Sequence, residues 1–294
     1  MRQQRQNVGA GRWRTGGVTT RLLQPLTLSL SLSIQIRQLA GWPTTAAPGI
    51  LDGVANSVRA DDPLAIAVAT AIRTGDLATL ERLLANNPDL ANLQIEGRKG
   101  GYRTPLHVAA DWPGYFPNGP AVVRLLLANG ADPNGVHPGP QETPLHWAAS
   151  SDDLDVAEAL IDGGADLEAS GGSIAGGGPL DNAVGYGCWR VARLLVQRGA
   201  RVDKLWHAAA LGMLGRTEEL LRGASPAEIN NAFWQACAGG QRRAAELLLA
   251  HGADLNWVPD YAKGTPLDQA GSIDTGRAAL VSWLRERGAR SARE

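Results

Sequence analysis

One heptapeptide occurs twice in this chain of 294 residues and strongly constrains its architecture. Thr104-Pro105-Leu106-His107-Val108-Ala109-Ala110 returns 39 positions later as Thr143-Pro144-Leu145-His146-Trp147-Ala148-Ala149, and weaker copies begin at Gly178 and Thr265. Self-similarity with a period of about 20–50 residues is typical of proteins in which each structural unit packs against its sequence neighbours. The chain should therefore fold as a row of similar units.

Each copy is followed by a second apolar stretch, and the residues of both segments favour helices. Thr104 is suited to cap a helix, and Pro105 suits the first helical position because its nitrogen needs no hydrogen-bond partner there. A Gly-Ala pair closes five of the second stretches, since glycine readily adopts the left-handed conformation that ends a helix. The second stretches are 122–127, 156–160, 191–196, 220–221, 247–249 and 281–284. Each unit should be a pair of helices.

This pattern resembles the ankyrin repeat, which is about 33 residues long and begins with Thr-Pro-Leu-His-x-Ala. We count about seven repeats. The first spans roughly residues 62–92, and the others start near Thr104, Thr143, Gly178, Lys204, Asn231 and Thr265. The resemblance implies an all-α solenoid over residues 61–294, with a concave side that binds other proteins. Two short intervals leave no room for a β-hairpin finger, and residues 111–119 form an insertion within a repeat.

The first sixty residues differ in composition from the rest. Residues 1–51 contain six Arg and no acid, whereas the remainder carries 22 basic and 29 acidic residues. We interpret residues 1–60 as a basic, low-complexity tail that is disordered or serves in targeting. The alternating residues 26–36 are also compatible with a strand, and a misassigned start codon is another reading. We expect no transmembrane segment and a cytoplasmic location, or export if residues 1–50 act as a signal.

Catalytic patterns are weak. His107, His146 and His207 share one repeat position, so we interpret them as structural residues that bond to neighbouring backbone. Ser173 lies in an incomplete nucleophile-elbow pattern, and His137 is an isolated loop histidine. A small hydrolase that uses these two residues is the alternative. We expect no enzyme activity, no metal site and no cofactor, and the net charge of −1 gives no reason to expect nucleic acid.

Three surface features are candidates for contacts with a partner. The first is the aromatic loop 111–119, because aromatic side chains often anchor protein interfaces. The second is a basic finger before Thr104, and the third is an acidic turn whose carboxylates also suit a helix start. The candidate residues are Trp112, Tyr115 and Phe116 in the loop, Arg98, Lys99, Tyr102 and Arg103 in the finger, and Asp152, Asp153 and Asp155 in the turn.

The sequence therefore predicts a non-catalytic interaction or scaffold protein. It should bind an unidentified protein partner through its concave face, its fingers and the aromatic loop. The preformed surface would lose little ordering entropy on binding. An exported accessory or host-directed protein of the same fold is a further alternative.

Overall fold

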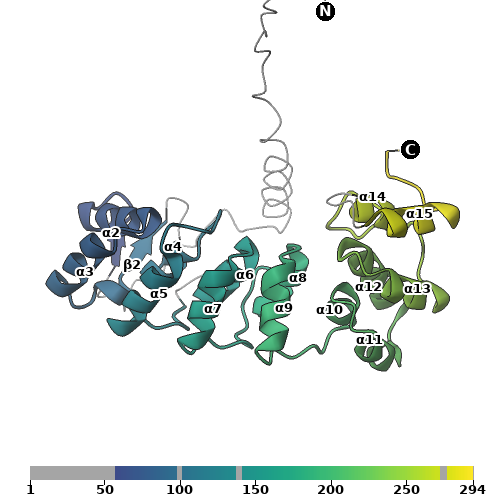
Figure 1. Cartoon of the computed structure of the whole chain (residues 1–294), viewed down its shortest axis with the longest axis horizontal. Coiled ribbons are helices and arrows are strands. Elements are labelled where there is room, and N and C mark those ends of the chain that lie inside the picture. Colours follow the sequence, from purple (N-terminus) through teal and green to yellow (C-terminus); the bar gives the residue numbers. More distant parts are fainter. Residues whose placement is uncertain (1–56, 98–100, 137–140, 272–276, 294) are drawn as a thin grey trace, which may run out of the picture. The chain divides into compact units, whose positions relative to one another are not determined.

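The computed structural model describes residues 57–97, 101–136, 141–271 and 277–293, which lie within a compact unit of residues 43–294 (Figure 1). The possible strand at 26–36 lies outside these ranges, as do Arg98, Lys99 and His137. The helices are α2 Pro63–Thr74, α3 Leu77–Asn86, α4 Pro105–Ala109, α5 Gly119–Ala128, α6 Pro144–Ser151, α7 Leu154–Asp162, α8 Pro179–Gly185, α9 Trp189–Gln197, α10 Leu205–Ala210, α11 Leu214–Leu221, α12 Pro226–Ala238, α13 Arg242–Ala250, α14 Pro266–Gly271 and α15 Ala278–Glu286, with a 3₁₀ turn at Leu90–Asn92.

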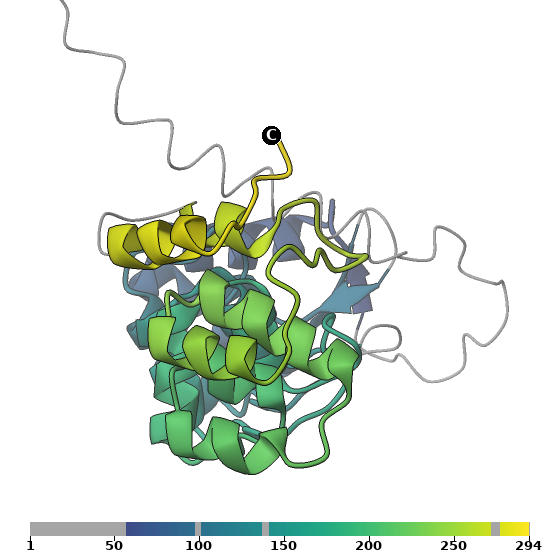
Figure 2. The same cartoon turned by 90° about the vertical axis from the view of Figure 1, so that its right-hand side faces the viewer.

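Within the described chain these α-helices form seven successive pairs, from α2–α3 to α14–α15, which confirms the predicted helical repeat. The first helix of each pair packs on the first helix of the next, as α6 does on α8 and α12 on α14. The second helices of several pairs follow the same rule, as α5 does with α7. The last two pairs, in green and yellow, lie side by side in both views (Figures 1 and 2).

Strands appear before the second helix pair. They are β1 (Ser57–Arg59), β2 (Gln94–Glu96) and β3 (Tyr102–Arg103), in the sheet order β1-β2-β3. The antiparallel β2–β3 pair forms the first finger, and β1 runs parallel to β2 with Val58 opposite Ile95. Residues 57–59 fall inside the stretch assigned to the tail, yet they pair with the sheet and Val58 packs against the core.

The sixth pair begins earlier than the repeat spacing indicates. Helix α12 starts at Pro226 rather than near Asn231, because Ser225 and Glu228 form a capping box. The Ser225 amide donates to Glu228 Oε2 over 2.8 Å, and the Glu228 amide donates to Ser225 Oγ over 3.3 Å. Reciprocal bonds of this kind satisfy two otherwise free donors at a helix start. The extra residues occupy the place where a finger would otherwise run.

The interior is built largely from Ala and Leu. The small Ala side chains let neighbouring helices approach closely. The interior falls into two clusters of buried apolar residues. One extends from Ala65 to Ala200 and includes Ala210, and the other extends from Leu205 to Ala289. Trp206 is partly buried and packs against both clusters. The two clusters therefore meet at α10.

Candidate interaction surface

The aromatic loop between α4 and α5 is tied to the helix pair before it. Asp111 Oδ2 accepts bonds from Arg73 at 3.2 Å and from Arg103 at 3.4 Å. At the other end of the loop, Asn118 Nδ2 donates to the carbonyl of Gly75 over 2.9 Å. Gly75 has φ of +69°, and a Cβ there would lie 2.2 Å from the carbonyl oxygen of Pro117. Only glycine fits this turn, so the loop can lie directly on it.

Tyr115 ties the same loop to the two following pairs. Its hydroxyl donates to the carbonyl of Asp152, and its amide donates to Asp153 Oδ2. The Arg190 guanidinium from α9 lies over the Tyr115 ring, 5.2 Å from the ring centroid, and pairs with Asp152 at 3.2 Å. Tyr115 is 50% exposed, but its position is fixed by these contacts. The loop thus bridges the helix turns of four successive pairs.

The three aromatic candidates differ in how far their side chains are exposed to solvent. Trp112 is 42% exposed, and its amide donates to Asp111 Oδ1 over 2.9 Å. Phe116 is half-buried. The structure therefore presents Trp112 and one face of Tyr115 on a fixed loop, whereas Phe116 lies partly within the protein.

The acidic turn has a structural role. Asp153 is 1% exposed and caps α7, with its Oδ1 accepting from the Val156 amide at 3.2 Å. Asp152 ends α6 in the left-handed conformation and accepts bonds from the amides of Arg190 and Val191. Burial raises the pKa of both carboxyls, and these hydrogen bonds oppose the rise. Asp155 lies in the first turn of α7, where a carboxylate is favourable.

The basic finger is only partly described. Tyr102 and Arg103 form β3 and are both half-buried. Arg103 is paired with Asp111, which links the finger to the aromatic loop. Burial lowers the pKa of Arg103, while Asp111 opposes this effect. Arg103 is thus part of the scaffold beneath the loop.

Two of the three repeated histidines join one pair to the next, as predicted. The Nδ1 atom of His107 accepts from the Thr104 amide at 3.2 Å, and its Nε2 bonds to the Glu142 carbonyl at 2.9 Å. His146 makes the same bonds to Thr143 and to Gly177. The pKa of His146 is lowered, chiefly because the ring is removed from water.

His207 departs from this pattern, so its predicted backbone bond is wrong. Neither ring nitrogen has a hydrogen bond within the described structure, and Nε2 lies 3.4 Å from Asp181 Oδ1 in the preceding pair, which is an ion-pair distance. Asp181 occupies the histidine position of its own pair and accepts from the Gly178 amide at 2.9 Å. The Asp181 carboxylate therefore accepts the bond at the start of its own helix, as Nδ1 of His107 does. It also attracts the His207 ring of the next pair.

Trp234 is a residue whose role the sequence did not reveal. It stands at the histidine position of the sixth pair, and its Nε1 donates to the Gly264 carbonyl over 2.9 Å. This bond is equivalent to that of His107. The sequence signal for this role is that Trp234 shares the repeat position of His107. An indole N–H can make the same bond there as an imidazole.

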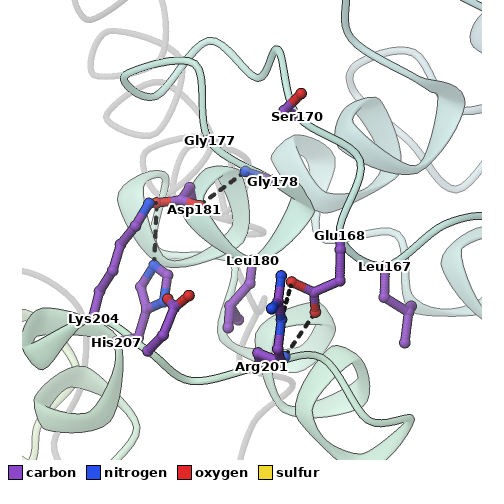
Figure 3. A pocket seen from close by; sticks show the side chains of 11 residues that line it. Leu167, Glu168, Ser170, Gly177, Gly178, Leu180, Asp181, Arg201, Lys204 and His207 are labelled. Atoms are coloured by element: carbon purple, nitrogen blue, oxygen red, sulfur yellow. Dashed lines mark hydrogen bonds and ion pairs between the residues drawn. The ribbon is translucent and has the colours of Figure 1, made fainter.

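A cavity of about 150 Å³ lies between the fourth and fifth pairs (Figure 3). Lys204 and His207 reach Asp181 at one side of it, and the Arg201–Glu168 pair, at 3.0 Å, lies at the other. Burial raises the pKa of Asp181, but the contacts with His207 and Lys204 outweigh it and lower the pKa to about 2. The acid and base side chains of this cavity mostly neutralise one another.

The features expected of an enzyme are sparse in the described ranges. Ser173 Oγ lies 3.0 Å from the Tyr186 hydroxyl, and the Ser173 amide donates to Glu142 Oε1. Within these ranges no group of three or more His, Cys, Asp or Glu side chains could hold a metal ion. Cys188 and Cys237 are free thiols and are buried. No helix that the structure describes could cross a membrane.

Parts of this chain are similar to known proteins. A family model described as ankyrin repeats, in three copies, matches residues 116–204. The mouse (Mus musculus) B-cell lymphoma 3 protein homolog is 28% identical over 235 residues, which cover 79% of this chain and 45% of the relative. The chain thus spans about half the length of this relative. The crystal structure of the human ASB11 ankyrin repeat domain shares 22% identity and has a TM-score of 0.46, covering 78% of this chain and 99% of that one.

The family match covers α5, the second helix of the second pair, and the third and fourth pairs, and the same paired helices continue on both sides of it. The Thr-Pro-Leu-His starts and the glycine-closed second helices recur in the structure as the sequence predicts. Together they show a solenoid of paired helices of the ankyrin type, in which residues 116–204 match the family model of ankyrin repeats.

Proposed function

We propose that this chain is a non-catalytic binding protein that recognises a protein partner through the aromatic loop and the first finger. Proteins with ankyrin repeats generally mediate protein–protein interactions, which supports the broad class. The observation that carries the proposal is the exposed Trp112 beside the fixed Tyr115. An aromatic pair held in place loses little conformational freedom on binding.

The charges around the loop favour a partner with mixed polar chemistry. Arg190 lies over the Tyr115 ring, and Arg73 pairs with Asp111, the residue before Trp112; both arginines are partly exposed. Their carboxylate partners, Asp152 and Asp111, are largely covered. The outward surface is therefore aromatic with a cationic edge, which suits a partner segment that combines an apolar side chain with an acidic one.

A photo-crosslinking amino acid at position 112 tests this function in the full chain. We expect a discrete covalent adduct with one protein when the probe replaces Trp112. The same probe at Ile66, which is 52% exposed on α2, is the matched control and should give none. Equal adducts at both positions, or no adduct at position 112, would contradict the proposal.

A further inference from the structure

The contacts that join successive helix pairs follow a regular pattern that is absent on both sides of the fifth pair. In the regular pattern, the side chain of a residue that follows one helix pair accepts a hydrogen bond. The donor is the backbone amide of a residue that follows the next helix pair. Asn92 accepts from Asp132 at 2.8 Å, Asn134 from Asp166 at 2.7 Å, Glu168 from Arg201 at 2.8 Å and Asn256 from Arg290 at 2.8 Å. These bonds connect the first four pairs to one another and the sixth pair to the seventh.

The pattern is absent between the fourth pair and the fifth, which we call the junction, and also between the fifth pair and the sixth. Asp203 occupies the position that Asn134 and Glu168 hold in earlier repeats. The corresponding amide of the fifth pair, that of Ser225, donates instead to Glu228 of its own capping box. The ring-to-carbonyl bond of the type made by His107 is also replaced here. Two side chains of the fifth pair, Lys204 and His207, reach Asp181 in its place.

Packing at the junction is looser as well. The cavity of about 150 Å³ lies there, between the segment 167–181 and the segment 201–207 (Figure 3). The contacts that join α5 to α7 and α7 to α9 are not repeated to the same extent between α9 and α11, nor between α13 and α15, in the described structure. By contrast, α10 and α12 pack closely and share the second core through Leu205 and Phe233. The fifth pair thus belongs with the sixth.

A repeat stack responds strongly to such a weak interface. Its stability is roughly the sum of the stability of each unit and of each interface between neighbours. One weak interface therefore permits the parts on either side to unfold or to separate independently. A junction held by side-chain charges rather than by backbone hydrogen bonds also depends on the presence of both partners.

We propose that the repeat region consists of two separately cooperative parts, residues 57–203 and 204–293, that open at the junction and are held closed by the contacts of Asp181 with Lys204 and His207. The second part should open first, because it contains three helix pairs against four. This proposal does not depend on the identity of a partner. It gives the protein a hinge at a defined place in the chain.

The two native cysteines provide a probe in each part. Cys188 precedes α9 in the first part and is 7% exposed, whereas Cys237 lies in α12 in the second part and is 0% exposed. Pulsed alkylation over a urea gradient, read by mass spectrometry, should modify Cys237 at a lower urea concentration than Cys188. Hydrogen exchange of α5 and α7, compared with α13 and α15, gives a second measurement away from the junction.

Two matched variants locate the boundary. Lys204→Met removes the ion pair with Asp181, and we expect the Cys237 midpoint to fall by about 0.5 M urea while the Cys188 midpoint stays in place. Asn134→Ala removes one regular interface bond within the first part and should lower only the Cys188 midpoint. The proposal is overturned if both cysteines and all four helices respond at one urea concentration in the native chain and in both variants.

Discussion

The indole nitrogen of Trp234 donates a hydrogen bond to the carbonyl of Gly264, 2.9 Å away, in the place where His107 bonds to Glu142. The ring is 8% exposed and also meets Tyr261 edge-on, with the ring centroids 6.0 Å apart. Two different side chains therefore make the same connection between successive repeats. An imidazole and an indole can therefore both supply the N–H group for this connection.

Replacing Trp234 with Phe should remove this bond and keep most of the apolar contact. Because the Gly264 carbonyl would lose a buried donor, we expect the free energy of unfolding to fall by about 1–2 kcal/mol. Urea denaturation followed by circular dichroism measures the change. Trp189→Phe is the control, since no hydrogen bond of its indole is found in the described structure. An equal effect of both variants would show that ring size, and not the bond, matters.

Removing the hydroxyl of Tyr115 should weaken the attachment of the aromatic loop to the third repeat. The Tyr115→Phe variant loses the bond to the Asp152 carbonyl, and we expect a loss of about 0.5–1 kcal/mol because the site is partly exposed to water. Trp112→Ser should change the free energy of unfolding by less than about 0.5 kcal/mol, since that side chain is 42% exposed. Thermal unfolding of the two variants measures both losses of stability. A larger loss for Trp112→Ser than for Tyr115→Phe would contradict this assignment.

The charged contacts at Asp181 should make stability depend on pH in the acid range. The pKa is lowered from 3.8 to about 2 in the folded protein, so the stabilisation is present above pH 4 and is lost as pH falls through 2. A shift of this size corresponds to about 2 kcal/mol. The difference in unfolding free energy between the native chain and Asp181→Asn should therefore shrink between pH 5 and pH 2. A difference that stays constant over this range would exclude the effect.

Deletion of residues 1–51 should leave the melting temperature within about 2 °C of the native value, because the described repeat region begins at Ser57. Deletion of residues 1–60 also removes β1 and its pairing with β2, and we expect a drop of several degrees. Differential scanning calorimetry of the two truncations distinguishes them. A large loss already in the shorter truncation would show that residues 1–51 stabilise the fold.

The repeated helix pairs were predictable because each carries its own start and stop signals. The Pro of Thr-Pro-Leu fixes the first helix, and the glycine after the second helix adopts a left-handed φ, as at Gly130 and Gly252. Helix α12 starts before the position that the repeat spacing predicts, because Ser225 and Glu228 form a capping box. A local cap signal determined the boundary there.

The connections between repeats were harder to predict. The direction of the His207 ring depends on a carboxylate 26 positions earlier, and the sequence pattern does not show which turns come together. The same holds for Tyr115, whose partners lie in the next two repeats. Such contacts follow from the stacking geometry, so they can be assigned only once the neighbouring repeats are placed.

The bonds that accept a backbone amide from the next repeat make no demand on that repeat's side chains. The Asn134 side chain bonds only to backbone groups of that repeat, the amide of residue 166 and the carbonyl of Gly164, so any residue except proline can stand at position 166. A duplicated or exchanged repeat could therefore form this hydrogen bond with its backbone alone. Gene rearrangements that add or remove repeats should be tolerated at the interfaces that use these bonds. At Asp181, by contrast, the new neighbouring repeat would have to supply a basic side chain.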